Sequence, residues 1–316
     1  MFELKSMSFY KLAILGIVMT GSNMLFANTS IPTLANHSVT IPLNNTHQPE
    51  TITHKTEAET LLTNSQIIDL ATQQSLTPQQ FLEKLASQDY VILGEYHDNK
   101  AQHQLAYWLL DSLNQQRPQG SLLLEMLTVD QQPLVNKATQ NPPQNLEQLS
   151  KALNWQSSWD WDLYGKIVQH PIHHHYSLVA TNLTKPEVST LMQGAEPIKG
   201  YDSTTPAIKA TIRNSILDNH HLDNASDEDM VIVNRMVEIQ QFRDRRMAEK
   251  ILSAPSPSLL LTGNFHAQKS VGVPIHLSDL QYNQSNPKQG VIVMMVSKTD
   301  DLSTDDADYA WVIDAD

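Results

Sequence analysis

Two short apolar runs constrain the fold of this chain more than any other feature of its sequence. The runs, residues 90–93 and 258–262, each stop at a glycine, and His97 and His266 each stand three residues after that glycine. An apolar run that gives way to an amphipathic stretch at a glycine is typical of a buried strand leading into a helix. We therefore predict that two strands of one sheet carry His97 and His266 to the same edge.

Glutamates follow apolar strands at two places in the sequence. Glu95 stands next to the first glycine, and Glu125 directly follows three leucines. A carboxylate at the end of an apolar strand needs a partner or a ligand, and open α/β sheets bind ligands at the carboxyl ends of their strands. Two interpretations stay open: a hydrogen-bonded cluster, or a divalent metal ion held by His97, Glu125 and His266 with Glu95 as general base.

Strand-like and helix-like segments alternate along the rest of the chain. Further strands are predicted at 121–124, 177–181, 290–296 and 309–313, and helices at 67–87, 99–115, 127–138, 207–219 and 230–253. This alternation predicts an α/β fold in which helices cover both faces of a central, largely parallel β-sheet. We expect a single domain over residues 61–316.

The N-terminal 60 residues carry no signal of a fold. Two lysines precede the apolar run at 12–19, so residues 1–27 are expected to form a signal peptide. Residues 28–60, rich in Asn, Thr and Pro, are expected to form a disordered linker. The sequence has no cysteine, which excludes disulfides, cysteine-bound metals and lipid attachment through cysteine. We expect an exported protein that is free in the periplasm.

The charge balance of the chain limits the class of its partners. The sequence has 21 basic and 34 acidic residues, a formal net charge of −13. This balance argues against nucleic-acid binding, and an anionic ligand would need a local basic patch. Arg243, Arg245 and Arg246 could form such a patch, or they could pair with carboxylates within the protein.

Aromatic residues and histidines concentrate between residues 155 and 175. The tryptophans at 155, 159 and 161 precede Tyr164, which indicates either core packing or a stacking surface for a flat aromatic ligand. The phenolate of Tyr164 could ligate ferric haem, because it is a hard anionic donor. The histidines at 170 and 173–175 indicate an exposed polar turn with adventitious metal binding.

Six motifs of the chain match one known family in order and spacing. They are LGEYHDN (93–99), LLLEM (122–126), WDWDLY (159–164), VATN (179–182), QQFRDRRMA (240–248) and LTGNFHAQKSVGVP (261–274). Over residues 89–316 the chain resembles the ChaN-like haem-binding lipoproteins, within the Tiki and erythromycin-esterase-like superfamily. The resemblance implies an α/β fold, a role in iron acquisition, and haem held by a tyrosine in a pocket at a dimer interface. Unlike many members, the chain has no cysteine to acylate.

The resemblance also implies candidate site residues. Tyr164 is the predicted iron ligand because it lies in a matching motif, with Tyr201 and Tyr96 as alternatives. The residues predicted to contact the haem are Tyr164, Trp161, Lys166, His173 and His174. The superfamily's metal-dependent hydrolase site, carried onto this chain, corresponds to Glu95, His97, Glu125 and His266.

Two functions of different classes follow from these patterns. The first is a periplasmic protein of iron uptake that binds ferric haem, dimerises on haem and exchanges it with an outer-membrane haem receptor or an inner-membrane transporter. The second is a metal-dependent hydrolase in which Glu95 activates water. Haem binding is expected to survive the loss of His97, and hydrolysis is expected to survive the loss of Tyr164.

Overall fold

The computed structural model describes residues 51–222, 224–297 and 302–313, with side chains from residue 57 onward. The predicted signal peptide and most of the predicted linker lie outside the described residues. The last part of that linker, however, belongs to helix α2 (Thr51–Thr63). Leu61 and Leu62 of this helix pack against the apolar core, and such tertiary packing is what stabilises a short helix. The linker prediction therefore extended too far toward the C-terminus.

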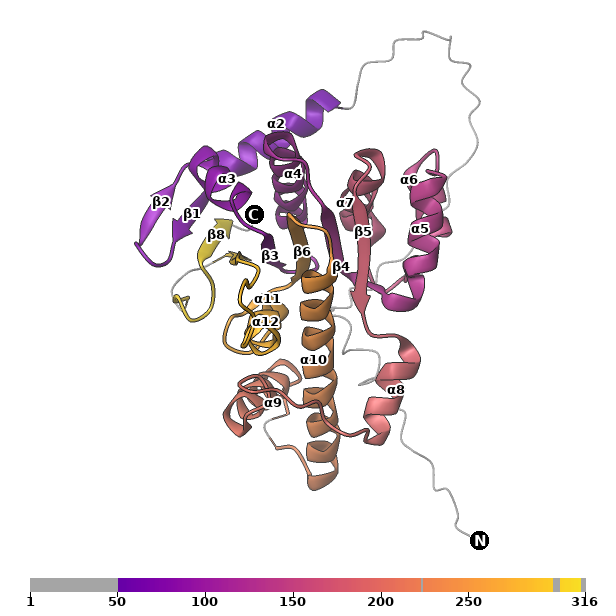
Figure 1. The fold of residues 1–316 in the computed structure, drawn as a ribbon, viewed down its shortest axis with the longest axis vertical. Coiled ribbons are helices and arrows are strands. Elements are labelled where there is room, and N and C mark those ends of the chain that lie inside the picture. The colour runs from indigo at the N-terminus through magenta and orange to yellow at the C-terminus, as the bar shows by residue number, and fades with distance from the viewer. Residues whose placement is uncertain (1–50, 223, 298–301, 314–316) are drawn as a thin grey trace, which may run out of the picture.

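An eight-stranded sheet forms the centre of the molecule, in the order β2-β1-β8-β7-β3-β6-β4-β5 (Figure 1). The strands are β1 (Ser65–Asp69), β2 (Gln74–Leu76), β3 (Tyr90–Glu95), β4 (Ser121–Thr128), β5 (Ser177–Asn182), β6 (Ser258–Gly263), β7 (Gly290–Val296) and β8 (Tyr309–Ile313). The strands from β8 to β5 are parallel, whereas β1 pairs antiparallel with β8 and β2 with β1. The predicted α/β fold with a largely parallel sheet is confirmed.

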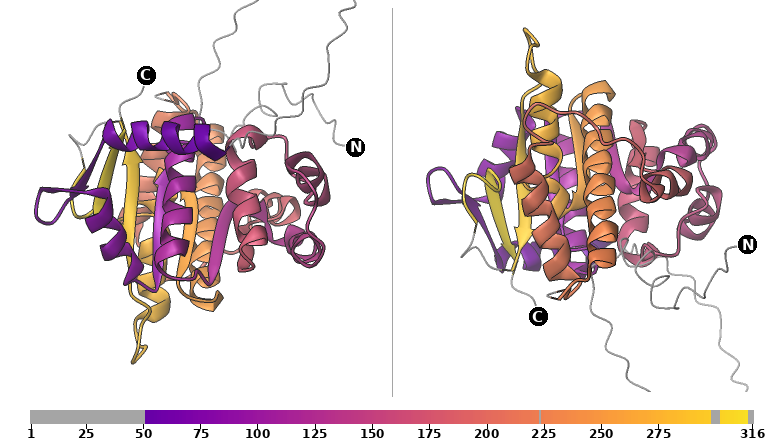
Figure 2. Two further views of the ribbon diagram at one scale, coloured as in Figure 1. Left: turned by 90° about the horizontal axis from the view of Figure 1, so that it is seen from above. Right: turned by 90° about the horizontal axis from the view of Figure 1, so that it is seen from below.

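Helices cover both faces of this sheet (Figure 2). They are α3 (Pro78–Ala86), α4 (Lys100–Gln116), the 3₁₀ turn η1 (Val129–Gln131), α5 (Gln132–Gln140), α6 (Leu146–Ala152), α7 (Trp161–His173), α8 (Lys185–Gln193), α9 (Pro206–Asn219), α10 (Asp227–Ser253), α11 (Asn264–Ala267) and α12 (Val273–Gln281). Leu93 shares a core with residues of α3, α4 and α7, and Ile92 shares the opposite core with residues of α10 and α12. Successive residues of a strand point to opposite faces, so a strand buried on both faces must be apolar throughout.

The long helix α10 extends beyond the sheet, where α8 and α9 pack beside its N-terminal half (Figure 1). Ile239 of α10 packs with Leu191 of α8, and Val237 of α10 packs with Ile212 of α9. These contacts fix both ends of the segment at 194–205, which connects α8 to α9.

Two of the predicted helices differ from the structure. The segment predicted as a helix at 67–87 contains the β1–β2 hairpin and then α3, which begins at Pro78. Pairing of β1 with β8 stabilises this hairpin, which the weak helical pattern could not reveal. The helix predicted at 127–138 instead starts at Gln132 after η1, with Pro133 in its first turn. Proline fits there because the first N–H groups of a helix have no intrahelical acceptor.

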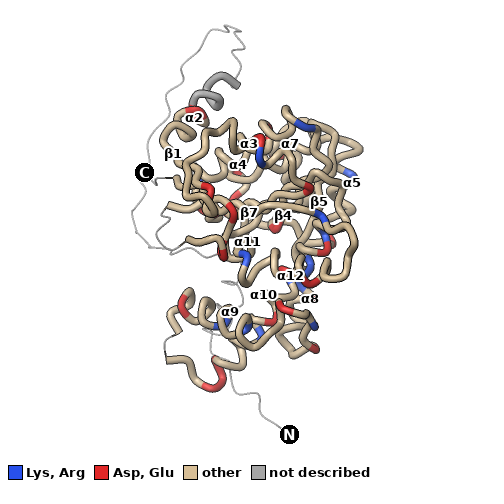
Figure 3. Tube along the Cα trace, turned by 60° about the vertical axis from the view of Figure 1, so that its left-hand side comes forward, with Lys and Arg blue, Asp and Glu red and all other residues tan. Residues whose placement is uncertain are grey.

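Both signs of charge occur throughout the described chain. Along the Cα trace, Lys and Arg are scattered among Asp and Glu and do not gather on a single element (Figure 3). None of the helices in the described ranges combines the length and the apolar character needed to cross a membrane.

Candidate functional site

Parallel pairing of three strands brings the predicted residues to one edge of the sheet. Strand β6 lies between β3 and β4, with Glu95 opposite Gly263 and Leu124 opposite Leu261. The turn after β3 carries His97, and the short helix α11 after β6 carries His266. The two histidines therefore lie at the carboxyl edge of the sheet, as their spacing from the glycines predicted.

Glu95 is the centre of the first half of this cluster. Its Oε1 lies 2.6 Å from Nδ1 of His97 and accepts a 2.9 Å hydrogen bond from the Tyr164 hydroxyl. Its Oε2 lies 3.4 Å from Nε2 of His103. The Glu95 residue is 1% exposed, and its Oε2 has no hydrogen-bond partner among the residues that the structure describes. The contact with Glu95 orients the His97 ring and leaves Nε2 of His97 to face the neighbouring strand.

Glu125 and His266 form the second half. Oε2 of Glu125 accepts hydrogen bonds from the Thr262 hydroxyl at 2.6 Å and from the Gly263 N–H at 2.9 Å. Nε2 of His266 lies 3.4 Å from Oε1 of Glu125, and its Nδ1 lies 2.6 Å from Asp244 of α10. The His266 ring is thus held between two carboxylates, one at each nitrogen.

Gly263 allows the two halves to approach each other. A Cβ atom at this position would lie 2.9 Å from Nε2 of His97 and 3.9 Å from Oε2 of Glu125. A side chain here would push the His97 ring away from Glu125. We name the residues Glu95, His97, Glu125, Asp244 and His266 the carboxyl-edge cluster.

Burial and mutual charge set the protonation of this cluster. Burial opposes the charged form of His266, but Glu125 and Asp244 outweigh it and raise the pKa of His266 to about 10. Burial likewise opposes the charged form of Glu125, but His266, His97 and the Thr262 hydroxyl hold its pKa well below the usual range. Burial raises the pKa of Asp244 to about 6 against the opposing effect of His266. At neutral pH the second half is an imidazolium between two carboxylates.

The hydrogen-bonded interpretation of the cluster fits this geometry better than the metal-site interpretation. Among the described residues, the His, Asp and Glu side chains whose donor atoms lie within 4.8 Å of one another in a group of three are Asp111, His170 and His174. The predicted trio of His97, Glu125 and His266 does not form such a group, although the carboxylates on both Nδ1 atoms are the outer partners that metal-bound imidazoles use. Metal binding by this trio stays a prediction.

The residues predicted to contact haem do not converge on one pocket. Tyr164 is fully buried, and burial followed by the charge of Glu95 raises its pKa far above the ordinary value, which disfavours the phenolate. Lys166 stands two positions further along α7 and is exposed on another side of the helix, and His173 and His174 are exposed at the far end of α7. Trp161 is partly buried with its ring centroid 4.9 Å from that of Trp155. The assignment of Tyr164 stays a prediction that this conformation does not favour.

Three tyrosines are more exposed than the other tyrosines of the described chain. Tyr201 is 67% exposed, Tyr282 60% and Tyr96 46%. The rings of Tyr201 and Tyr282 stack with centroids 4.7 Å apart and planes 25° apart, although 81 positions separate them in the sequence. Asp279 holds the Tyr201 segment in place by accepting hydrogen bonds from the N–H groups of Tyr201 and Asp202.

The arginines predicted as a ligand patch have partners within the protein. Arg245 pairs with Asp279 at 3.3 Å, and Arg246 pairs with Glu187 at 2.8 Å. Arg243 is buried near the charges of Glu125 and Asp244. A shallow groove of about 410 Å³ lies elsewhere, between α5 and α10 at the amino end of β5, so it does not open onto the carboxyl-edge cluster.

Sequence reasoning missed one member of the cluster, Asp244, and several side chains that contact the cluster. Asp244 and Gln240 are four positions apart on α10, so they share a face, and the Gln240 amide lies 2.8 Å from Nδ1 of His266. This spacing inside the motif at 240–248 was the available signal. Tyr164 lies in the motif at 159–164 and His103 stands four residues after the motif at 93–99, but nothing in the sequence indicated that both face Glu95.

Comparison with known proteins supports the family resemblance that the sequence motifs indicated. A solved structure of ChaN from Campylobacter jejuni, described as showing cofacial haem binding, is 28% identical, with a TM-score of 0.73 over 79% of this chain and 97% of that chain. A Bacillus cereus protein is 16% identical (TM-score 0.40, 77% and 75% covered), and an erythromycin esterase in its open conformation is 13% identical (TM-score 0.39, 69% and 72% covered). No curated protein matches the chain. The model of the family described as haem-binding uptake, Tiki superfamily, ChaN matches residues 81–277, and the chain belongs to this family.

Proposed function

We propose that this protein binds ferric haem for iron uptake through an exposed tyrosine, and that a second copy of the chain covers the haem. The observation that carries the proposal is the stacked pair of Tyr201 and Tyr282, because it presents two phenols and a flat aromatic surface to solvent. The Campylobacter jejuni relative, with 97% of its length covered, is described as binding haem cofacially.

The surroundings of Tyr201 suit a haem ligand better than those of Tyr164. An iron-bound tyrosine must reach the haem face with its oxygen, and Tyr201 is 67% exposed whereas Tyr164 is fully buried. Lys199 stands two residues before Tyr201 with 89% of its side chain exposed, so it can reach a haem propionate. Tyr96, on the turn beside His97, is the second choice.

A dimer follows from the shape of the ligand. Haem is flat, and one protomer that contacts it from an open surface leaves the opposite apolar face in water. Large exposed apolar patches are the surfaces that proteins cover by association. A second copy that covers this face would give a closed, two-fold symmetric assembly.

A titration of the purified protein with ferric haem, followed by absorbance and sedimentation, tests the proposal. We expect saturable binding with a tyrosinate-type spectrum and a shift from monomer to dimer. Tyr201→Phe should lose that spectrum, and Tyr164→Phe should keep it. Retention of the spectrum in Tyr201→Phe with loss in a stably folded Tyr164→Phe would return the ligand to Tyr164. Weak, unsaturable binding by the parent protein would overturn the haem proposal itself.

The second candidate function is a metal-dependent hydrolase. It is favoured by the two carboxylate–imidazole pairs that approach each other across Gly263, with His97 partly open to solvent at 22% of its side chain. In this function Glu95 would act as general base and an ion on His97, Glu125 and His266 would polarise the substrate. Hydrolysis of ester substrates that is lost with chelator and in His97→Ala, while haem binding persists, would support it.

We propose the periplasm as the place of function, on the basis of the signal-like segment at residues 1–27. There the protein would receive haem from an outer-membrane receptor or pass it to an inner-membrane transporter. Fractionation of expressing cells, with a cytoplasmic and a periplasmic marker protein, tests the location.

A further inference from the structure

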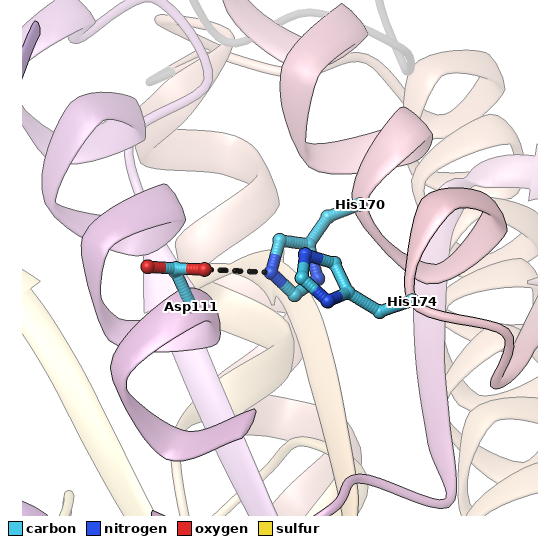
Figure 4. A group of neighbouring side chains, drawn as sticks. All are labelled: Asp111, His170 and His174. Atoms are coloured by element: carbon cyan, nitrogen blue, oxygen red, sulfur yellow. Dashed lines mark hydrogen bonds and ion pairs between the residues drawn. The ribbon is translucent and has the colours of Figure 1, made fainter. Parts of the chain in front are cut away.

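We propose that Asp111, His170 and His174 form a binding site for a divalent transition-metal ion of the zinc type, separate from both the haem surface and the carboxyl-edge cluster. Asp111 comes from α4, His170 from the last turn of α7, and His174 directly follows α7 as its C-cap (Figure 4). One donor atom of each side chain lies within 4.8 Å of the other two. We name these residues the α4–α7 cluster.

The distance between His170 and Asp111 fits a shared ion better than a direct hydrogen bond. Nε2 of His170 lies 3.3 Å from Oδ1 of Asp111. A charge-assisted hydrogen bond between imidazole and carboxylate would be shorter, at about 2.7–2.9 Å. Two ligands of a tetrahedral zinc ion, each bonded at about 2.0–2.1 Å, stand about 3.4 Å apart.

Neighbouring side chains orient the donor atoms. The Tyr176 hydroxyl lies 2.7 Å from Nδ1 of His170, so it can accept a hydrogen bond from Nδ1–H and leave the lone pair of Nε2 directed at Asp111. Oδ2 of Asp111 accepts a 2.6 Å hydrogen bond from Gln115, which leaves Oδ1 for the ion. Such outer partners fix the tautomer and the direction of metal ligands.

The histidines also have the spacing that a metal requires. His170 and His174 stand four positions apart, and their rings stack with centroids 4.1 Å apart. Two imidazoles at this spacing are a recurrent zinc-binding arrangement on helices. His174 is exposed, so the fourth position on the ion is open to water.

The α4–α7 cluster lies away from the carboxyl edge of the sheet. Helix α4 starts just after β3 and runs back along the sheet, and Asp111 is in its second half. Helix α7 ends four residues before β5 starts. Helices α4 and α7 pack on the same face of the sheet. An ion here would therefore also link the two helices.

Titration of the haem-free full chain with Zn²⁺ by calorimetry, and with Co²⁺ by absorbance, tests the proposal. We expect one equivalent of Zn²⁺ and the visible bands of tetrahedral Co²⁺. Tyr176→Phe should weaken Zn²⁺ binding by about 10- to 100-fold, as for other outer partners of metal ligands. His174→Ala and Asp111→Asn, which remove ligands, should weaken it at least as much.

Two control variants make the result specific. His173→Ala removes an exposed histidine next to the cluster and should leave affinity unchanged, as should His97→Ala in the carboxyl-edge cluster. Equal loss in His173→Ala and His174→Ala would show only adventitious binding by a histidine-rich surface and would overturn the proposal. Loss in His97→Ala with retention in His174→Ala would place the ion in the carboxyl-edge cluster and would also overturn it.

Discussion

The carboxyl-edge cluster and the α4–α7 cluster differ in how closely carboxylates approach the nitrogen atoms of their histidines. In the carboxyl-edge cluster, Nδ1 of His97 and Nδ1 of His266 each lie 2.6 Å from a carboxylate oxygen. In the α4–α7 cluster, the carboxylate of Asp111 stays 3.3 Å from His170, and His174 is exposed. The first cluster is closed by its own ion pairs, and the second is open to solvent.

This difference shows that residue type alone does not define a metal site. Both clusters contain two histidines and at least one carboxylate. A closed cluster gains its stability from the charges inside it and must lose a proton before it can take an ion. An open cluster with a neutral imidazole has no internal ion pairs to break and no proton to release when an ion binds. It is therefore the better metal site, and it contributes less to the stability of the fold.

The largest expected effect of a single substitution is in the closed cluster. Glu125→Ala removes a partner of His266 and leaves the imidazolium buried beside Asp244 alone, so we expect the free energy of unfolding to fall by about 3–5 kcal/mol. Urea unfolding measures it. Glu196→Ala is the control, because 80% of that glutamate side chain is exposed and its loss should change little. A Glu125→Ala variant that is more stable than the parent protein would contradict this structural role. It would mean that the cluster destabilises the fold and is kept for a function.

The pH dependence of stability separates the two clusters by sign. The pKa of His266 rises from 6.5 in the unfolded chain to about 10 in the folded one, so its stabilising effect is complete below pH 6.5 and is lost toward pH 10. The pKa of His170 falls from 6.5 to about 4, so its cost appears as the pH drops from 6.5 toward 4. The pKa of Asp244 is about 6, so Asp244 does not titrate in the range from pH 6.5 to 10 in which the effect of His266 is lost.

Urea unfolding across this pH range, with a chelator present, tests both signs. His266→Gln should flatten the alkaline decline and leave the acidic one, and His170→Gln should reduce the acidic decline and leave the alkaline one. An alkaline decline that persists unchanged in His266→Gln would contradict the ion pairs described for that residue.

The sequence predicted the sheet and the convergence of His97, Glu125 and His266 because both depend on local patterns. Apolar runs that end at glycine define parallel strands, and parallel strands share a carboxyl edge. The role of Tyr164 as a haem ligand, which its motif and aromatic neighbours suggested, stays a prediction. Whether a phenol on α7 points into the core at Glu95 or outward depends on the rotation of that helix against the sheet, and no local pattern records it. The stacking of Tyr201 on Tyr282 was hidden for the same reason, since it joins two distant segments.

The smallest expected effect is in the open cluster, and it depends on the metal. Without metal, Asp111→Asn should change the free energy of unfolding by no more than about 0.5 kcal/mol, because the side chain is 35% exposed and its contact with His170 is long. With Zn²⁺ at about 100 times its dissociation constant, the parent protein should gain about 2.7 kcal/mol, and the variant should gain much less. Thermal or urea unfolding with and without Zn²⁺ measures both. A large loss without metal would show that Asp111 and His170 form a structural ion pair, so that the two clusters are alike after all. A zinc-dependent gain confined to the parent protein would establish that an open cluster contributes to stability only when it is filled.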